Sequence, residues 1–178
     1  MTSVFTLGVD SPGVPANSLL VYDGETGVGE LFVVDKNDGA LLSSVTTAIG
    51  NQTVGGSYHE GRGTFFGVNW VTDEIMEMGL VSGSVLNTFT VSPPGAPAFD
   101  VFFGDIDVDP TTGNIVVVSV SQNSIRVLSP TGVLIRDVDV GNLGISGMAG
   151  IAWDASTGTA WIASTNGSVY HVGGIPTG

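Results

Sequence analysis

Residues 107–130, DVDPTTGNIVVVSVSQNSIRVLSP, share their design with a second stretch, IAWDASTGTAWIASTNGSVYHVGG at residues 151–174. When the two are aligned, Asp109 matches Asp154 and Gly113 matches Gly158, each at a step of 45 residues (154 − 109 and 158 − 113). Both stretches consist of short strand-forming runs separated by turn residues. A repeat of about 40–50 residues built from strands is typical of propeller blades. We therefore predict an all-β fold, a β-propeller made of four-stranded antiparallel blades.

The rest of the chain follows the same pattern less strictly. The third copy is the clearest, with expected strands at 104–109, 114–120, 124–129 and 133–140. We expect a single domain over residues 1–178, with repeats at approximately 4–50, 51–91, 103–141 and 148–174. The fourth repeat contains only three strands, so its blade is expected to lack the outer strand.

An acidic residue ends the first strand of each repeat in this alignment. The four are Asp10, Glu60, Asp109 and Asp154. Aspartate side chains in tight turns accept hydrogen bonds from nearby backbone N–H groups. We therefore predict a structural turn role for Asp10, Asp109 and Asp154, with Gly113 and Gly158 closing their turns.

The segment VDPTTGNIVVVSVSQNSIRVLSPTG (108–132) resembles the blade consensus of YVTN-type and NHL-type β-propeller repeats. Those blades combine an Asp-Pro-x-x-Gly turn, a β-branched second strand and an Asn/Ser-rich turn before the third. The resemblance covers residues 104–173 well and the first repeat loosely, whereas the second repeat has YHEGR (58–62) where the turn belongs. It implies a propeller fold. Such propellers include surface-layer and adhesion proteins, interaction scaffolds, and lyases or lactone hydrolases, so the fold alone does not imply a function.

The composition argues against nucleic acid as a partner and against a membrane-spanning segment. Four Lys and Arg residues against 17 Asp and Glu leave a net charge of −13, and a nucleic-acid binder needs cations to displace counterions from phosphates. No run approaches the roughly 18 apolar residues of a membrane-spanning helix. The chain has no cysteine and its start shows no signal peptide. The absence of cysteine is compatible with the cytosol, and it also suits exported bacterial proteins, which are often acidic and cysteine-poor; we predict an extracellular or cell-surface location.

Asp105 and Asp107 are the candidate metal ligands. Alternate residues of a strand share a face, so their carboxylates point the same way as that of Asp109. Carboxylates gathered on one face repel each other unless water or a cation such as Ca²⁺ lies between them. Asp105 and Asp107 have no acidic counterparts in the other repeats. They therefore predict either a Ca²⁺ site or a solvated channel wall.

His59, Glu60 and Arg62 are the candidate catalytic residues, since a histidine and a glutamate can exchange protons and an arginine can hold an anion. The alternative is a polar turn. His171 is expected to be structural, and Trp70, Trp153 and Trp161 are expected in the core. The sequence contains no G-x-S-x-G elbow and no phosphate-binding loop.

The favoured function is an extracellular structural or binding module that associates with other copies of itself through blade edges, to complete a ring or a polymer. A glycan or another protein is the alternative ligand. A second hypothesis is a channel-mouth enzyme, a lyase or lactone hydrolase dependent on a divalent cation. A third is a segment of a longer propeller.

Overall fold

The structure, a computed structural model, describes residues 2–6, 18–23, 29–49, 52–175 and 178. Consecutive strands form four separate antiparallel sheets in these residues, numbered here 1 to 4. Sheet 1 contains β1 (Thr2–Thr6), β2 (Ser18–Asp23), β3 (Glu30–Asp35) and β4 (Leu41–Thr46). Sheet 2 contains β5 (Thr53–His59), β6 (Thr64–Asn69), β7 (Glu74–Gly79) and β8 (Val85–Thr90). Sheet 3 contains β9 (Asp105–Val108), β10 (Ile115–Val118), β11 (Ser124–Leu128) and β12 (Leu134–Asp139). Sheet 4 contains β13 (Met148–Asp154), β14 (Thr159–Ser164) and β15 (Val169–Gly173), and a short 3-10 helix, η1 (Gly141–Leu143), precedes it.

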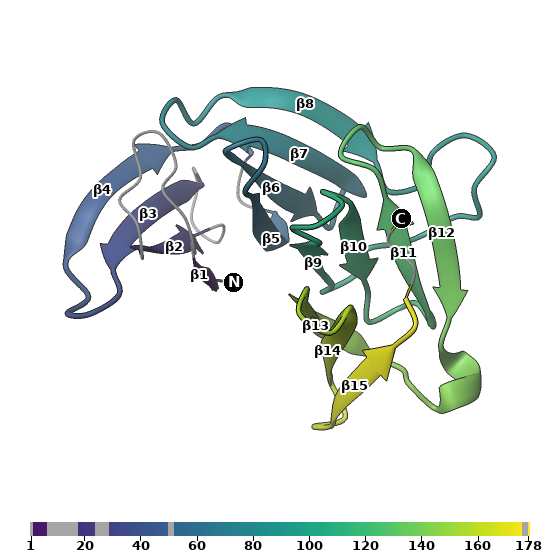
Figure 1. Ribbon diagram of the computed structural model, residues 1–178. Coiled ribbons are helices and arrows are strands. Elements are labelled where there is room, and N and C mark those ends of the chain that lie inside the picture. The colour runs from purple at the N-terminus through teal and green to yellow at the C-terminus, as the bar shows by residue number, and fades with distance from the viewer. Residues whose placement is uncertain (1, 7–17, 24–28, 50–51, 176–177) are drawn as a thin grey trace.

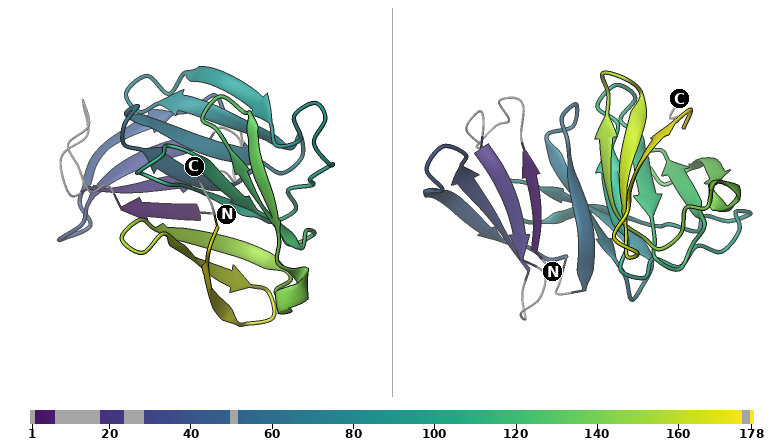
Figure 2. Two further views of the ribbon diagram at one scale, coloured as in Figure 1. Left: turned by 45° about the vertical axis from the view of Figure 1, so that its right-hand side comes forward. Right: turned by 90° about the horizontal axis from the view of Figure 1, so that it is seen from below.

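The sheets are arranged as blades around a common centre. The first strand of each sheet is the innermost: β5 contacts β1 on one side and β9 on the other, and β9 also contacts β13. Figure 1 shows the four sheets fanned in an arc, with sheet 1 at one end and sheet 4 at the other. Figure 2 shows the same order from two further directions. The prediction of an all-β propeller of about four blades is confirmed.

The hydrophobic core lies between the sheets. Neighbouring residues of a strand point to opposite faces, so they enter different cores. Phe65 packs with sheet 1 residues, whereas Phe66 packs with sheet 3 residues. The run IVVV of β10 is buried throughout for the same reason: Val117 joins the core toward sheet 2 and Val116 the core toward sheet 4.

Among the described residues, each of the two end sheets has a neighbouring sheet on one face only. In sheet 1, Leu20 is buried against sheet 2 whereas its neighbour Leu19 is half-buried. In sheet 4, Ile162 is buried against sheet 3. Trp161 points the other way and is 47% exposed, with its ring stacked on His171 at 4.2 Å between ring centroids. The expectation that Trp161 belongs to the core is therefore wrong, because the face that carries it has no neighbouring sheet in the described residues.

The turns after the innermost strands correct one alignment. The amide of Gly113 donates to the Asp109 carbonyl at 2.7 Å, and that of Gly158 donates to the Asp154 carbonyl at 2.8 Å. In sheet 2 the equivalent bond runs from Gly63 to the carbonyl of His59 at 2.9 Å. His59, and not Glu60, therefore occupies the position of the turn aspartates.

Candidate functional site

Asp105 and Asp107 lie on the innermost strand β9 and join it to the neighbouring blades. Asp105 accepts hydrogen bonds from the amides of Ile106 at 2.9 Å and of Ile151, on β13, at 3.2 Å. Asp107 accepts bonds from the Ser57 hydroxyl on β5 at 2.6 Å and from the Trp153 amide on β13 at 2.6 Å. The two carboxylates thus connect three successive blades at the centre of the fold.

The surroundings of these carboxylates disfavour their charged form. Burial, together with the nearby charge of Asp107, raises the pKa of Asp105 to about 7, although the amides of Ile151 and Ile106 favour the carboxylate. Burial also raises the pKa of Asp107 above its ordinary value, opposed by the bonds from Ser57 and Trp153. Both shifts favour the protonated form of these two carboxyl groups relative to a solvent-exposed aspartate.

A Ca²⁺ ion at the predicted site would find two carboxylate groups, those of Asp105 and Asp107. Both carboxylate oxygens of each residue already accept at least one N–H or O–H group from the chain. The described residues contain no group of three or more His, Cys, Asp or Glu side chains placed to hold a metal ion. Hard cations take six to eight oxygen ligands. Most ligands of a cation here would have to be water or backbone oxygens.

Asp109 and Asp154 lie in the turns that follow β9 and β13. Asp109 is buried, and its carboxylate accepts the Thr111 amide at 2.9 Å and the Thr112 hydroxyl at 2.8 Å. The Asp154 carboxylate accepts the amide of Ser156 at 2.9 Å. Gly113 and Gly158 close the two turns with φ of 75° and 64°. Asp10, the third aspartate assigned to such a turn, lies outside the described residues.

His59 is buried at the end of β5, with 8% of its surface exposed. Its ring packs near the Phe66 ring and over Gly113 of the neighbouring blade, and its Nδ1 has no hydrogen-bond partner among the described residues. Burial and the charge of Arg62 lower the pKa of His59, so the imidazole is neutral at neutral pH. A buried neutral ring between two blades fits a packing role better than proton exchange with a substrate.

The three catalytic candidates, His59, Glu60 and Arg62, do not form one site. Arg62 donates two hydrogen bonds to Glu77 of β7, at 2.6 and 2.8 Å, whereas Glu60 is exposed in the turn. Burial raises the pKa of Glu77, but the bonds from Arg62 and Thr64 outweigh this and hold the pKa below its ordinary value. Glu77 is the residue that the sequence analysis missed. The available signal was its place on the same strand face as the apolar Ile75.

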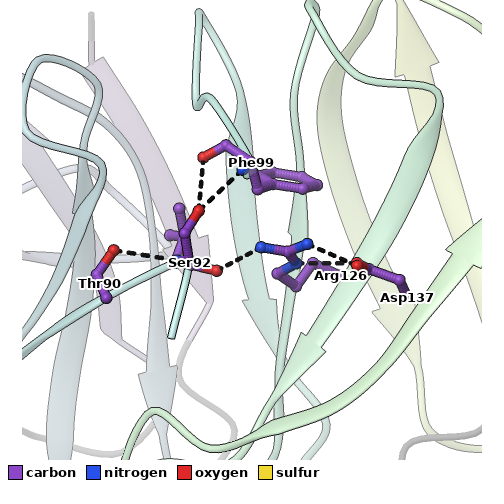
Figure 3. Close-up of polar contacts among 6 residues, drawn as sticks. Thr90, Ser92, Phe99, Arg126 and Asp137 are labelled. Carbon is purple, nitrogen blue, oxygen red and sulfur yellow. Dashed lines mark hydrogen bonds and ion pairs between the residues drawn. The ribbon is translucent and has the colours of Figure 1, made fainter. Parts of the chain in front are cut away.

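Arg126 of β11 forms a second buried charged group (Figure 3). Its guanidinium, 1% exposed, donates to both carboxylate oxygens of Asp137 at 2.8 and 2.6 Å and to the Val91 carbonyl at 2.8 Å. It also lies over the Phe99 ring, 4.7 Å from the centroid. Val91 and Phe99 belong to the segment that leaves sheet 2, so Arg126 ties sheet 3 to that segment.

The described part of the chain contains no helix with the length and apolar character that crossing a bilayer requires.

Comparisons with known proteins show the fold. No protein-family model matches the chain, and no curated protein matches its sequence. Among solved structures, Kuenenia stuttgartiensis hydrazine synthase superposes with a TM-score of 0.66 at 12% identity, over 96% of this chain and 45% of that one. A Bacteroides caccae protein of unknown function gives 0.63 at 16% identity, over 85% and 53%. Virginiamycin B lyase from Staphylococcus aureus gives 0.58 at 14% identity, over 89% and 49%.

The chain thus spans about half the length of these solved structures. At such low identity the likeness concerns architecture alone, and the roles of the matching proteins are diverse. Together with the radial order of the sheets, it shows that this chain has a β-propeller fold.

Proposed function

We propose that the chain is a binding and structural propeller module that associates with a second copy of itself, each copy supplying half of a closed ring. The observation that carries the proposal is the apolar outer face of both end sheets. Within the chain, every contact between neighbouring sheets buries apolar side chains from both. The two outer faces offer the same kind of surface without a covering sheet in the described residues.

The outer face of sheet 1 is formed by four apolar side chains on two paired strands. Leu19 lies opposite Val34, and Val21 lies opposite Phe32. All four are half-buried, whereas the residues that alternate with them are buried against sheet 2. A half-exposed apolar face without a covering sheet is typical of an interaction surface.

The outer face of sheet 4 is similar. Trp161 lies between Ala152 and His171 across the three strands, and Val169 is exposed beside them. A second copy can place this face against sheet 1 of the first, and the two-fold operation repeats the contact at the other end. Such a two-fold arrangement closes the ring and leaves no apolar face open.

The test is the mass in solution. Light scattering coupled to gel filtration should give twice the chain mass of 18.1 kDa over a wide range of concentrations. A stable monomer would contradict the proposal and favour the alternative in which further blades of a longer chain cover the two faces. A ladder of higher masses would contradict the closed ring and favour an open polymer.

We also propose an extracellular or cell-surface location. The acidic and cysteine-free composition supports it, because such chains remain soluble without a disulfide framework and carry no thiol to oxidise. Fractionation of the cells that produce the natural protein tests it, and recovery of the protein from the cytosolic fraction alone would contradict it.

A further inference from the structure

An aromatic platform lies at the junction of sheets 2 and 3, away from the two outer faces. It consists of Trp70, Phe102 and Phe103. The Trp70 and Phe103 rings stack at 5.6 Å with an interplanar angle of 17°, and the Phe102 ring stands edge-on to Phe103 at 4.6 Å. Trp70 packs against the core between the sheets, but Phe102 and Phe103 are each 42% exposed. Adjacent, partly exposed aromatic rings of this kind are typical of an interaction site.

The segment that carries the platform is firmly held. Its backbone is bonded through the Val101 amide to the Asp73 carboxylate at 2.8 Å and through the Phe102 amide to the Ser119 hydroxyl at 3.0 Å. Phe99, three residues before Phe102, is buried and packs against the Arg126 guanidinium (Figure 3). The rings are therefore presented to solvent by a fixed backbone, which lowers the entropic cost of binding.

The backbone at this place is also strained. Among the described residues only two that are not glycine have positive φ, namely Asp73 at 55° and Phe103 at 47°. Asp73 anchors the segment, and Phe103 is part of the platform. A bulky residue in the left-handed region is unfavourable, and such strain collects at binding and catalytic sites. Both residues with positive φ thus belong to the segment, or to its anchor, that holds the exposed rings in place.

Charge decides which class of ligand suits the platform. The chain carries a net charge of −13, and one of its four basic residues, Arg126, is already buried in its ion pair. Asp100, two residues before Phe102, is exposed. Aromatic faces in a negative field attract cations, above all alkylated ammonium and guanidinium groups that give up water readily. We propose that the aromatic platform is a binding site for an organic cation of this class.

Nuclear magnetic resonance of the Trp70 indole N–H, assigned with Trp70→Phe, tests the site. The probes are choline chloride and N-acetylarginine amide, with 3,3-dimethylbutanol as the uncharged counterpart of choline. At least one cation should shift the Trp70 signal saturably, at least tenfold more tightly than the alcohol, and more weakly at high salt. Tighter binding of choline would indicate a small quaternary ammonium ligand, and tighter binding of the arginine derivative a polypeptide side chain.

Two variants separate a site from an incidental cluster. Phe102→Leu combined with Phe103→Leu should weaken cation binding at least fivefold while the fold is retained, as judged by the remaining indole signals. Trp161→Leu removes an exposed ring from sheet 4 and should leave binding at the platform unchanged, whatever its effect on association. Equal binding of the alcohol and the cations, or no shift with either cation, would overturn the proposal.

Discussion

Buried Arg126 shows how one charged residue can set local stability. Its guanidinium has three partners, the Asp137 carboxylate, the Val91 carbonyl and the Phe99 ring. Asp137 lies opposite Arg126 on the neighbouring strand of the same sheet, whereas nothing in the sequence places Arg126 against Val91 and Phe99, because those two contacts depend on how sheet 3 packs against the segment that leaves sheet 2. The only sign was a basic residue between Ile125 and Val127 in a strand with apolar residues on both sides.

Replacing this arginine should destabilise the fold strongly. Arg126→Met keeps the apolar length of the side chain but leaves the Asp137 carboxylate without its partner, so we expect a loss of about 3 kcal/mol in the free energy of unfolding. Urea unfolding followed by fluorescence measures it. Arg136→Met, at an exposed position of β12, is the matched control and should change the free energy by less than about 0.5 kcal/mol. Equal effects of the two substitutions would contradict the assigned role of Arg126.

Asp105 should make stability depend on pH. Its pKa is near its ordinary value of about 3.9 in the unfolded chain and about 7 in the folded one, so the folded state holds the proton over a wider range. The stabilisation is complete below about pH 4 and disappears as the pH rises through 7. Between pH 5 and pH 8 the free energy of unfolding should fall by about 2–3 kcal/mol from this group.

Asp105→Asn isolates that contribution, because its amide does not titrate. Urea unfolding at both pH values should show a smaller difference in the variant than in the natural chain. Glu60→Gln, at an exposed glutamate, is the control and should leave the difference unchanged. A variant with the full pH dependence of the natural chain would show that other groups cause it.

At the scale of elements, the sequence repeat predicted the strands and most turns correctly, whereas individual side chains predicted fewer of the contacts. The β-branched run of β10 and the turn of Asp109 follow from the sequence because local backbone chemistry decides them. The turn of sheet 2 was misplaced by one residue, since Glu60 looked like the missing acid. The backbone places His59 there, and its side chain fills space against Gly113 where an aspartate would bind the turn.

Because His59 replaces an aspartate at this position, alanine should destabilise the fold by different amounts at the two equivalent glycines, Gly113 and Gly158. Both have positive φ, so alanine is strained at either position by about 1 kcal/mol. A methyl group at Gly158 meets nothing within 4 Å, whereas one at Gly113 would lie 2.6 Å from Nε2 of His59. Gly113→Ala should therefore cost about 1–2 kcal/mol more than Gly158→Ala in urea unfolding.

A double-mutant cycle identifies the source of the difference. Combining Gly113→Ala with His59→Ala should recover most of the extra loss, because the clashing ring is absent. Additive effects in the cycle would mean that the histidine is not the obstacle.

At the scale of the molecule, the outer faces of sheets 1 and 4 are the surfaces that most affect assembly. Phe32→Asp places a charge in the outer face of sheet 1 and should convert the proposed dimer to monomer, because an unpaired charge in an apolar contact is costly. Gel filtration with light scattering measures the change. Leu143→Asp, at an exposed leucine of η1, should leave the mass unchanged. Dissociation by both variants, or by neither, would contradict the assignment of the face.

The placement of the cores between sheets also governs how the molecule opens. A sheet in the middle of the arc is held by two cores and an end sheet by one, as in a linear array whose units are stabilised by their neighbours. In the single chain, as in the expected monomer of Phe32→Asp, fraying should therefore begin at sheets 1 and 4, and the amides of β10 should exchange with deuterium more slowly than those of β3 and β14. In a closed ring that gradient disappears because every sheet has two neighbours. Hydrogen exchange would then report ring closure residue by residue. The amides of sheets 1 and 4 would become protected from exchange only when the partner copy packs against them.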